Sequence, residues 1–162
     1  MSFYMKHQKF ARIGSEREAN TILNTYHLDI LTNLIDKFKE INMAGKFCIS
    51  LTCGKDNTDK ATVAFVVANA AVASDKDTLV FLNIEGVHIS QKGYADSIHE
   101  EGFSPLKELV ESFVNAGGKI FVCAPCFKKR KLDESNLIPG AAIVGGAKLV
   151  EFMSDNCPSV SY

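Results

Sequence analysis

The chain has 162 residues, of which 46% are hydrophobic and 23% are charged. This composition is typical of an ordinary globular domain and argues against intrinsic disorder. The formal net charge of -1 gives no electrostatic reason to expect binding to nucleic acid or to a membrane surface. A chain of this length usually forms one principal folded domain.

The sequence also argues against a membrane protein or a secreted one. No apolar run approaches the roughly 20 residues that a helix needs to span a bilayer, and the stretch from Met1 to His7 lacks the hydrophobic region of a secretory signal. We therefore expect a cytoplasmic protein. An odd number of cysteines in a reducing compartment indicates free thiols rather than a disulfide framework. The five cysteines are Cys48, Cys53, Cys123, Cys126 and Cys157.

The N-terminal part of the chain differs in pattern from the rest. Residues 1–14 are polar and aperiodic, which predicts a loose arm, and Ser15–Glu18 fits a helix capping box. Apolar residues recur at spacings of three and four from Ile22 to Ile41, which predicts an amphipathic helix. We expect residues 1–45 to form this arm and helix, whose apolar face packs on the following domain or meets another subunit.

Short apolar runs alternate with helical segments over residues 46–162. The predicted strands are Lys46–Cys53, Thr78–Ile84, Lys119–Val122, Ala141–Val144 and a short closing strand at Ser159–Tyr162. The run Asp56–Asp59 supplies an N-cap for a helix predicted to about Ser74. Further helices are predicted from Pro105 to about Ala116, near Pro125, after Asp133, and over Ala147–Ser154. Strands that are apolar throughout and alternate with helices predict a three-layer α/β domain with a mostly parallel sheet.

Polar and reactive residues follow the predicted strands. In a parallel α/β sheet, ligands and reactive groups gather beyond the carboxyl ends of the strands. Cys53 follows the first strand, Glu85 and Gly86 the second, Cys123 the third, and Gly145–Gly146 the fourth. We expect Cys53, Glu85 and Gly86 to bind substrate at this edge.

The pair Cys123 and Cys126 provides the candidate catalytic residues. Cys123 leaves a buried strand just before Pro125, so its thiol would feel the partial positive charge of a helix N-terminus, which favours the thiolate. The basic run Lys128–Lys131 would add to this field if it folds toward the loop. Such a run is more often just a solvated surface. The alternatives to that interpretation are a docking surface for an acidic partner and stabilisation of the thiolate. On this reasoning Cys123 is the better nucleophile.

Other chemistries remain open for the same residues. Two cysteines in a C-x-x-C arrangement can also cycle between dithiol and disulfide, although the motif comes later in the chain than in a thioredoxin fold. We expect no metal site, because no second C-x-x-C pair or H-x-x-x-H spacing is present. His88 and His99 could reach the same edge, but lone histidines are more often structural. No glycine-rich nucleotide signature or serine nucleophile elbow occurs.

Several short stretches, taken in order, resemble the DsrE/DsrF-like sulfur-relay family, which includes the TusD-type proteins of tRNA thiolation. The resemblance covers residues 46–162 and is fairly specific because the stretches occur in this order. They are Lys60–Thr62 through Asn69–Ala71, Phe81–Val87, Lys92–Asp96, Gly117–Gly118, Val122–Cys126 and Ala141–Gly146.

The resemblance implies a five-stranded α/β fold that commonly assembles as a homo-trimer or hexamer. In the sulfur carriers of that family, a cysteine near Cys123 or Cys126 accepts a persulfide sulfur and passes it on, which needs no bound cofactor. We therefore expect a cytoplasmic sulfur carrier or sulfurtransferase-like protein, with sulfur donor and acceptor proteins as partners. The alternatives are a binding or assembly protein without turnover, and a dithiol redox protein that uses Cys123 and Cys126.

Overall fold

The structure is a computed structural model that describes residues 25–32, 34, 45–154 and 156–162. The chain divides into two compact units, Met1–Met43 and Ala44–Tyr162, and each is described by itself. In the first unit, the described residues form a helix that lies within the predicted amphipathic helix, and Tyr26, Ile30 and Leu34 of its apolar face are exposed. The predicted capping box at Ser15–Glu18 lies outside the described residues. The expectation that this apolar face packs on the following domain or meets another subunit stays a prediction.

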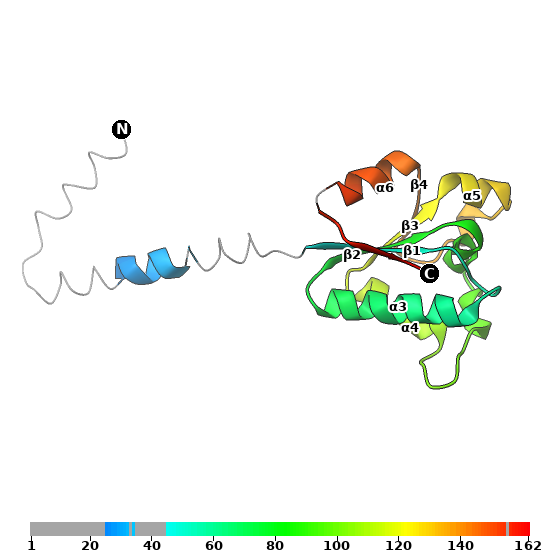
Figure 1. Cartoon of the computed structure of the whole chain (residues 1–162), viewed down its shortest axis with the longest axis horizontal. Helices are drawn as coiled ribbons and strands as arrows, with labels where there is room; N and C mark the ends of the chain where they lie inside the picture. The colour runs from blue at the N-terminus through cyan, green and yellow to red at the C-terminus, as the bar shows by residue number, and fades with distance from the viewer. Residues whose placement is uncertain (1–24, 33, 35–44, 155) are drawn as a thin grey trace, which may run out of the picture. The chain divides into compact units, whose positions relative to one another are not determined.

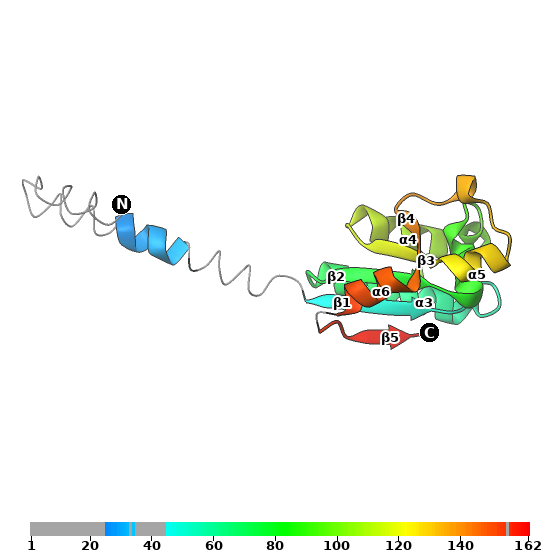
Figure 2. The ribbon, with the colours of Figure 1, turned by 90° about the horizontal axis from the view of Figure 1, so that it is seen from above.

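The second unit is built on a five-stranded sheet in the order β4-β3-β2-β1-β5 (Figures 1 and 2). Every neighbouring pair of strands is parallel. The strands are β1 (Lys46–Leu51), β2 (Asp77–Leu82), β3 (Lys119–Cys123), β4 (Ala141–Val144) and β5 (Ser159–Ser161). The predicted α/β class, the parallel sheet and the five strands are confirmed.

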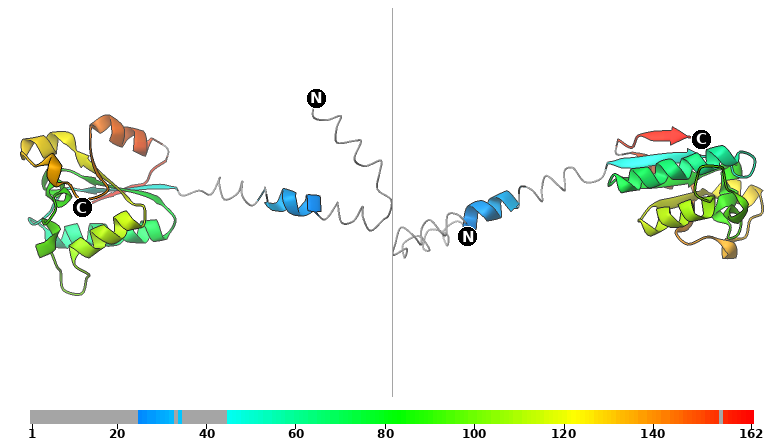
Figure 3. Two further views of the ribbon diagram at one scale, coloured as in Figure 1. Left: turned by 180° about the vertical axis from the view of Figure 1, so that it is seen from behind. Right: turned by 90° about the horizontal axis from the view of Figure 1, so that it is seen from below.

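Helices cover both faces of this sheet, which makes the three layers (Figures 1 and 3). One face carries α3 (Thr58–Ala73) and α4 (Leu106–Asn115), and the other carries α5 (Ala124–Lys129) and α6 (Gly146–Met153). The connections also contain three short 3-10 helices, η1 (Ile84–Ser90), η2 (Ala95–Ser97) and η3 (Glu134–Asn136). In the described part of the chain, no helix is both long enough and apolar enough to cross a membrane.

Local sequence explains why the helices begin and pack where they do. The Asn57 side chain accepts the Lys60 backbone N–H at 3.1 Å, which caps α3 as the sequence predicts. The alanines of α3 let the helix lie close to the sheet, and Phe65 then meets Phe113 of α4 edge to face, with ring centroids 5.9 Å apart. This packing forms the larger core and fixes α3 against β1 and β2.

The predicted carboxyl end of the second strand, Ile84, is wrong. β2 stops at Leu82, and Ile84 already begins η1 with a left-handed φ of +51°. The first predicted strand is likewise too long, because β1 stops at Leu51. Both strands stop there because the chain after β2 turns back over the end of β1, where the Gly86 N–H donates to the Thr52 carbonyl at 3.2 Å. This turn shapes the edge at which the cysteine pair lies.

Candidate thiol site

The predicted cysteine pair lies at the carboxyl end of β3. Cys123 is the last residue of the strand and the N-cap residue of α5, and Cys126 lies one turn further, inside α5. Both side chains are half-buried free thiols. Because α5 packs against η1, the residues that follow β2 lie beside this pair. The topology thus brings the ends of two neighbouring strands together around the two sulfurs.

The surroundings separate the two thiols electrostatically. Burial is the largest influence on the pKa of each, and alone it would raise both. At Cys126 it is outweighed by hydrogen bonds from the Cys123 thiol and the Ile84 backbone N–H, and the positive charges of Arg130 and Lys129 also act there. The pKa of Cys126 is therefore lowered. Burial and the bond donated to Cys126 raise the pKa of Cys123, so the pair ionises first at Cys126.

Arg130 ties the loop after β2 to the helix after β3. Its Nε donates to Oε1 of Glu85 at 3.1 Å, Nη2 donates to the same oxygen, and Nη1 donates to the Cys126 carbonyl at 3.3 Å. The other Glu85 oxygen lies 3.4 Å from Nε2 of His88. The hydrogen bond from Arg130 holds the pKa of Glu85 below its ordinary value. The predicted site residue Glu85 therefore lies beside the cysteines. Its carboxylate holds the guanidinium of Arg130 next to Cys126.

The basic run after Cys126 divides into two kinds of residue. Arg130 turns inward, and its side chain is 14% exposed. The three lysines of the run, Lys128, Lys129 and Lys131, are exposed. The two interpretations of this run thus apply to different members, since Arg130 lies at the thiol and the lysines form a charged surface around it.

Gly86 is required by a close approach of two backbones. A Cβ at this position would lie 2.4 Å from the Leu51 carbonyl oxygen and 3.3 Å from that of Cys53. Only glycine lets η1 lie this near the end of β1. This gives Gly86 a structural reason to be at the site edge, and its predicted contact with substrate stays a prediction.

Cys53 belongs to the core rather than to the exposed part of this edge. It is 5% exposed, and burial raises the pKa of its thiol. Its predicted contact with substrate likewise stays a prediction. A ring nitrogen of His99 lies 3.0 Å from the Phe103 carbonyl oxygen, a contact within its own loop.

Sequence reasoning missed the aromatic support behind Glu85. The His88 ring stacks on Tyr94 with centroids 5.4 Å apart, and the Tyr94 hydroxyl accepts the Lys55 backbone N–H at 2.9 Å. His88 is therefore held between Glu85 and an aromatic ring rather than being a lone histidine. The pairing of residues 88 and 94 follows from the course of η1 and leaves no pattern in the sequence.

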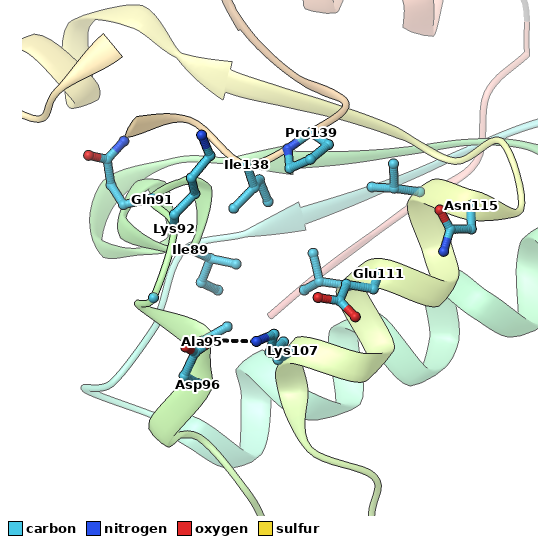
Figure 4. A pocket seen from close by; sticks show the side chains of 13 residues that line it. Ile89, Gln91, Lys92, Ala95, Asp96, Lys107, Glu111, Asn115, Ile138 and Pro139 are labelled. Carbon is cyan, nitrogen blue, oxygen red and sulfur yellow. Dashed lines mark ion pairs between the residues drawn. The ribbon is translucent and has the colours of Figure 1, made fainter. Parts of the chain in front are cut away.

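A separate cavity of about 580 Å³ lies beside α4 (Figure 4). Its apolar wall includes Ile89 and Val110, and an ion pair between Lys107 and Asp96 at 3.6 Å stands at its rim. None of the predicted site residues lines it. Within the described residues, no cluster of three or more histidine, cysteine, aspartate or glutamate side chains could hold a metal ion.

Two archaeal proteins show what the sequence is similar to. The chain is 30% identical over 103 residues to the uncharacterized protein MJ0760 of Methanocaldococcus jannaschii, covering 64% of this chain and 38% of that protein. It is 27% identical over 120 residues to the uncharacterized protein MJ0989 of the same organism, covering 72% of this chain and 99% of that protein. The chain thus spans well under half the length of MJ0760, whereas it matches nearly all of MJ0989.

Two solved structures share the fold. The ychN protein of E. coli superposes with a TM-score of 0.63 at 18% identity, over 73% of this chain and 99% of that one. The protein MTH1491 of Methanobacterium thermoautotrophicum gives a TM-score of 0.55 at 12% identity, over 72% and 100%. Each of these chains therefore corresponds as a whole to the larger part of this one.

The family comparison covers the part of the chain that holds the thiol site. The DsrE/DsrF-like family matches residues 45–158, which run from just before β1 to just before β5. The match includes Glu85, Cys123 and Cys126. It confirms the resemblance seen in the sequence: the chain belongs to the DsrE/DsrF-like family.

Proposed function

We propose that this protein carries sulfane sulfur as a persulfide on Cys126, with Cys123 as the neighbouring neutral thiol. The observation that supports this most is the position of the half-buried Cys126 beside Arg130, whose side chain donates to the Cys126 carbonyl and whose charge helps to lower the pKa of the thiol. A thiolate is the species that attacks a sulfur atom, and its fraction at neutral pH sets how much of the nucleophile is available. The sulfur relay implied by the family resemblance supports the same chemistry.

Loading needs only a thiolate and a persulfide donor. The Cys126 thiolate attacks the outer sulfur of a donor R–S–SH, forming a new S–S bond while the donor's own S–S bond breaks. The donor leaves as the thiolate R–S⁻, and the protein becomes Cys126–S–SH. Charge and atoms balance without an external oxidant or a bound cofactor. Arg130 lies close enough to Cys126 to stabilise the negative sulfur before the attack.

The order of the two thiols differs from the sequence-based expectation, which favoured Cys123. Cys123 donates a hydrogen bond to Cys126 and has a raised pKa, so it stays protonated while Cys126 reacts. A Cys123 thiolate would attack Sγ of Cys126–S–SH, form a disulfide between the two residues and expel HS⁻. Keeping Cys123 neutral suppresses this loss of the stored sulfur, which is what a carrier requires.

The partners and the assembly belong to the same proposal. We propose donor and acceptor proteins that meet the site in the cytoplasm, and a homo-oligomer of the trimer or hexamer kind. The exposed lysines Lys128, Lys129 and Lys131 support an acidic partner surface.

Intact-mass measurement after loading tests the carrier function. The reduced protein is incubated with glutathione persulfide, the excess is removed, and the mass is read without reductant. The parent protein and Cys123→Ser are expected to gain the mass of one sulfur, and Cys126→Ser is not. Cys157→Ser is the matched control, since Cys157 is another half-buried thiol with a raised pKa. Equal loading of Cys126→Ser and the parent would contradict the proposal.

A dithiol redox function is the second candidate, because Cys123 and Cys126 are free thiols one helical turn apart and each shifts the pKa of the other. It predicts that mild oxidation removes two of the five thiols reversibly and that the oxidised protein accepts electrons from a model dithiol. A carrier instead holds an extra sulfur that a thiol acceptor removes. A binding or assembly protein without turnover predicts that Cys126 alkylates no faster than Cys157.

A further inference from the structure

The cavity beside α4 has apolar walls that are held in place by the fold. Its floor includes the buried aliphatic side chains of Ile89 and Val110, and none of the described residues that line it is aromatic. The Ile138 N–H donates to the Ser90 carbonyl at 2.8 Å, which fixes the chain before β4 against the end of η1. The volume of about 580 Å³ falls within the range of about 300–1000 Å³ that is usual for small-molecule sites.

One side chain of each charge lines this cavity without an ion-pair partner. Lys107 lies one turn before Glu111 in α4 but pairs with Asp96 of η2 at 3.6 Å, so the Glu111 carboxylate pairs with no cation among the described residues (Figure 4). Lys92 comes from the turn after η1. Its N–H donates to the Asn136 carbonyl at 2.9 Å, whereas its ammonium group pairs with no carboxylate in the described part of the chain. The two available charges therefore stand on different walls.

Asn115 adds a neutral polar group to the same cavity. It is the last residue of α4, and within the ranges that the structure describes its side-chain amide makes no hydrogen bond. Gln91 also lines the cavity, but its amide already exchanges hydrogen bonds of 3.1 and 3.2 Å with the Asp133 backbone. A side-chain amide both donates and accepts hydrogen bonds, as a peptide group does. An ammonium, a carboxylate and an amide are thus available beside an aliphatic surface.

We propose that this cavity binds a short aliphatic peptide of about two or three residues with free ends. The C-terminal carboxylate of the peptide pairs with Lys92, its N-terminal ammonium pairs with Glu111, and a peptide group between them bonds to Asn115. Its aliphatic side chains cover Ile89 and Val110. A single amino acid matches less well, because its ammonium and carboxylate are attached to the same carbon. None of these residues belongs to the thiol site, so the inference does not depend on the carrier function.

The apolar walls and the charges contribute differently to this binding. Burial of the aliphatic side chains supplies most of the affinity, since it removes apolar surface from water. Lys92 and Glu111 are exposed, so each pairs with the peptide in the presence of water and adds at most about fivefold to the affinity. The two charges therefore set the direction in which the peptide lies.

The first test titrates valyl-alanyl-valine into ¹⁵N-labelled full-length protein and follows the amide signals by NMR. The Ile89 and Glu111 amides are expected to shift and to saturate with a Kd below about 1 mM. The Leu149 amide is the control, because α6 lies on the other face of the sheet, and it should not move (Figures 1 and 3). Absence of saturating shifts at Ile89 and Glu111 up to about 10 mM peptide would overturn the proposal.

The second test pairs changes in the protein with changes in the peptide. Lys92→Gln is expected to weaken binding of the free peptide about threefold and to leave the affinity for its C-terminal amide unchanged. Glu111→Gln should behave in the same way toward the free and the N-acetylated peptide. Lys128→Gln removes an exposed charge that does not line the cavity and should leave every affinity unchanged. Equal weakening of free and modified peptides, or no weakening of the free peptide, would overturn the placement of the charges.

The third test separates the aliphatic walls from the charged ends. Triglycine carries the same two end charges but no aliphatic side chain, so it is expected to bind at least about tenfold more weakly than valyl-alanyl-valine. Equal affinities for the two peptides would overturn the aliphatic class of the ligand.

Discussion

The side chain of Arg130 donates to the carboxylate of Glu85, with Nε 3.1 Å from Oε1, and so joins the loop after β2 to the helix after β3. The same guanidinium also donates to the main-chain carbonyl of Cys126. Because the Arg130 side chain is only 14% exposed, water screens its charge less than that of the neighbouring lysines. The position of one carboxylate therefore determines that a positive charge lies beside Cys126.

Loss of the Arg130 charge is expected to slow the alkylation of the Cys126 thiol. In Arg130→Gln the pKa of Cys126 rises, because one of the positive charges that lower it is gone. The second-order rate of alkylation at pH 7 should fall about fivefold, since the thiolate fraction falls with rising pKa. Lys128→Gln removes an exposed charge from the same run and should change the rate less than about twofold. Similar rates for Arg130→Gln and the parent would show that the guanidinium does not act on this thiol.

Gly86 is expected to tolerate no side chain. In Gly86→Ala the new Cβ would lie 2.4 Å from the Leu51 carbonyl oxygen, so η1 must move away from the end of β1. The free energy of unfolding should fall by about 2 kcal/mol or more in chemical denaturation. Gly146→Ala is the matched control, because open space surrounds that position at the start of α6, and it should change stability by at most about 0.5 kcal/mol. An equally stable Gly86→Ala protein would contradict the close approach.

Relief of the strain at position 84 is expected to stabilise the fold. Asparagine accepts the left-handed region more readily than isoleucine, and Ile84 is 50% exposed, so the substitution gives up only part of a buried side chain. Ile84→Asn should raise the free energy of unfolding by about 1 kcal/mol. Val150→Asn also replaces an exposed apolar residue, but in the regular helix α6, where asparagine is no better than valine. A gain in Val150→Asn as large as that in Ile84→Asn would argue against strain relief.

Cys48 is expected to weaken the fold at high pH. Burial, helped by the negative charge of Cys157, raises the pKa of Cys48 from 9.0 to about 11. A raised folded pKa gives stability that is complete below the unfolded value and is lost as pH rises through the folded value. Between about pH 9 and about pH 11 the loss from this group should approach about 1.4 kcal/mol per pH unit. Denaturation of Cys48→Ala across this range should show a shallower decline than the parent, and parallel declines would contradict the assignment.

The sequence predicts the framework of this edge because the framework follows local patterns. Apolar runs bounded by glycine and proline mark the strands, and β4 has its predicted bounds. The position of Cys123 at the end of β3 then follows from the parallel arrangement. Asn57 caps α3 as predicted, because capping depends on residues only three positions apart.

The electrostatics of the pair depend on contacts that no local pattern encodes. Arg130 reaches Glu85 across 45 positions of the chain, and nothing in the run from Lys128 to Lys131 shows which member turns inward. The left-handed turn at Ile84 is harder still, because an isoleucine in an apolar run predicts an extended strand. This turn ends β2 early and brings the backbone of Ile84 to Cys126, where it contributes to the lowered pKa of that thiol.

The most direct measurement of the central claim locates the stored sulfur in the parent protein. After loading with glutathione persulfide, the protein is blocked with an alkylating reagent at low pH, digested, and the peptide that contains both cysteines is fragmented by mass spectrometry. The account predicts the added sulfur on Cys126, with Cys123 blocked as an ordinary thiol. Added sulfur on Cys123, or on Cys157 instead of the pair, would contradict it.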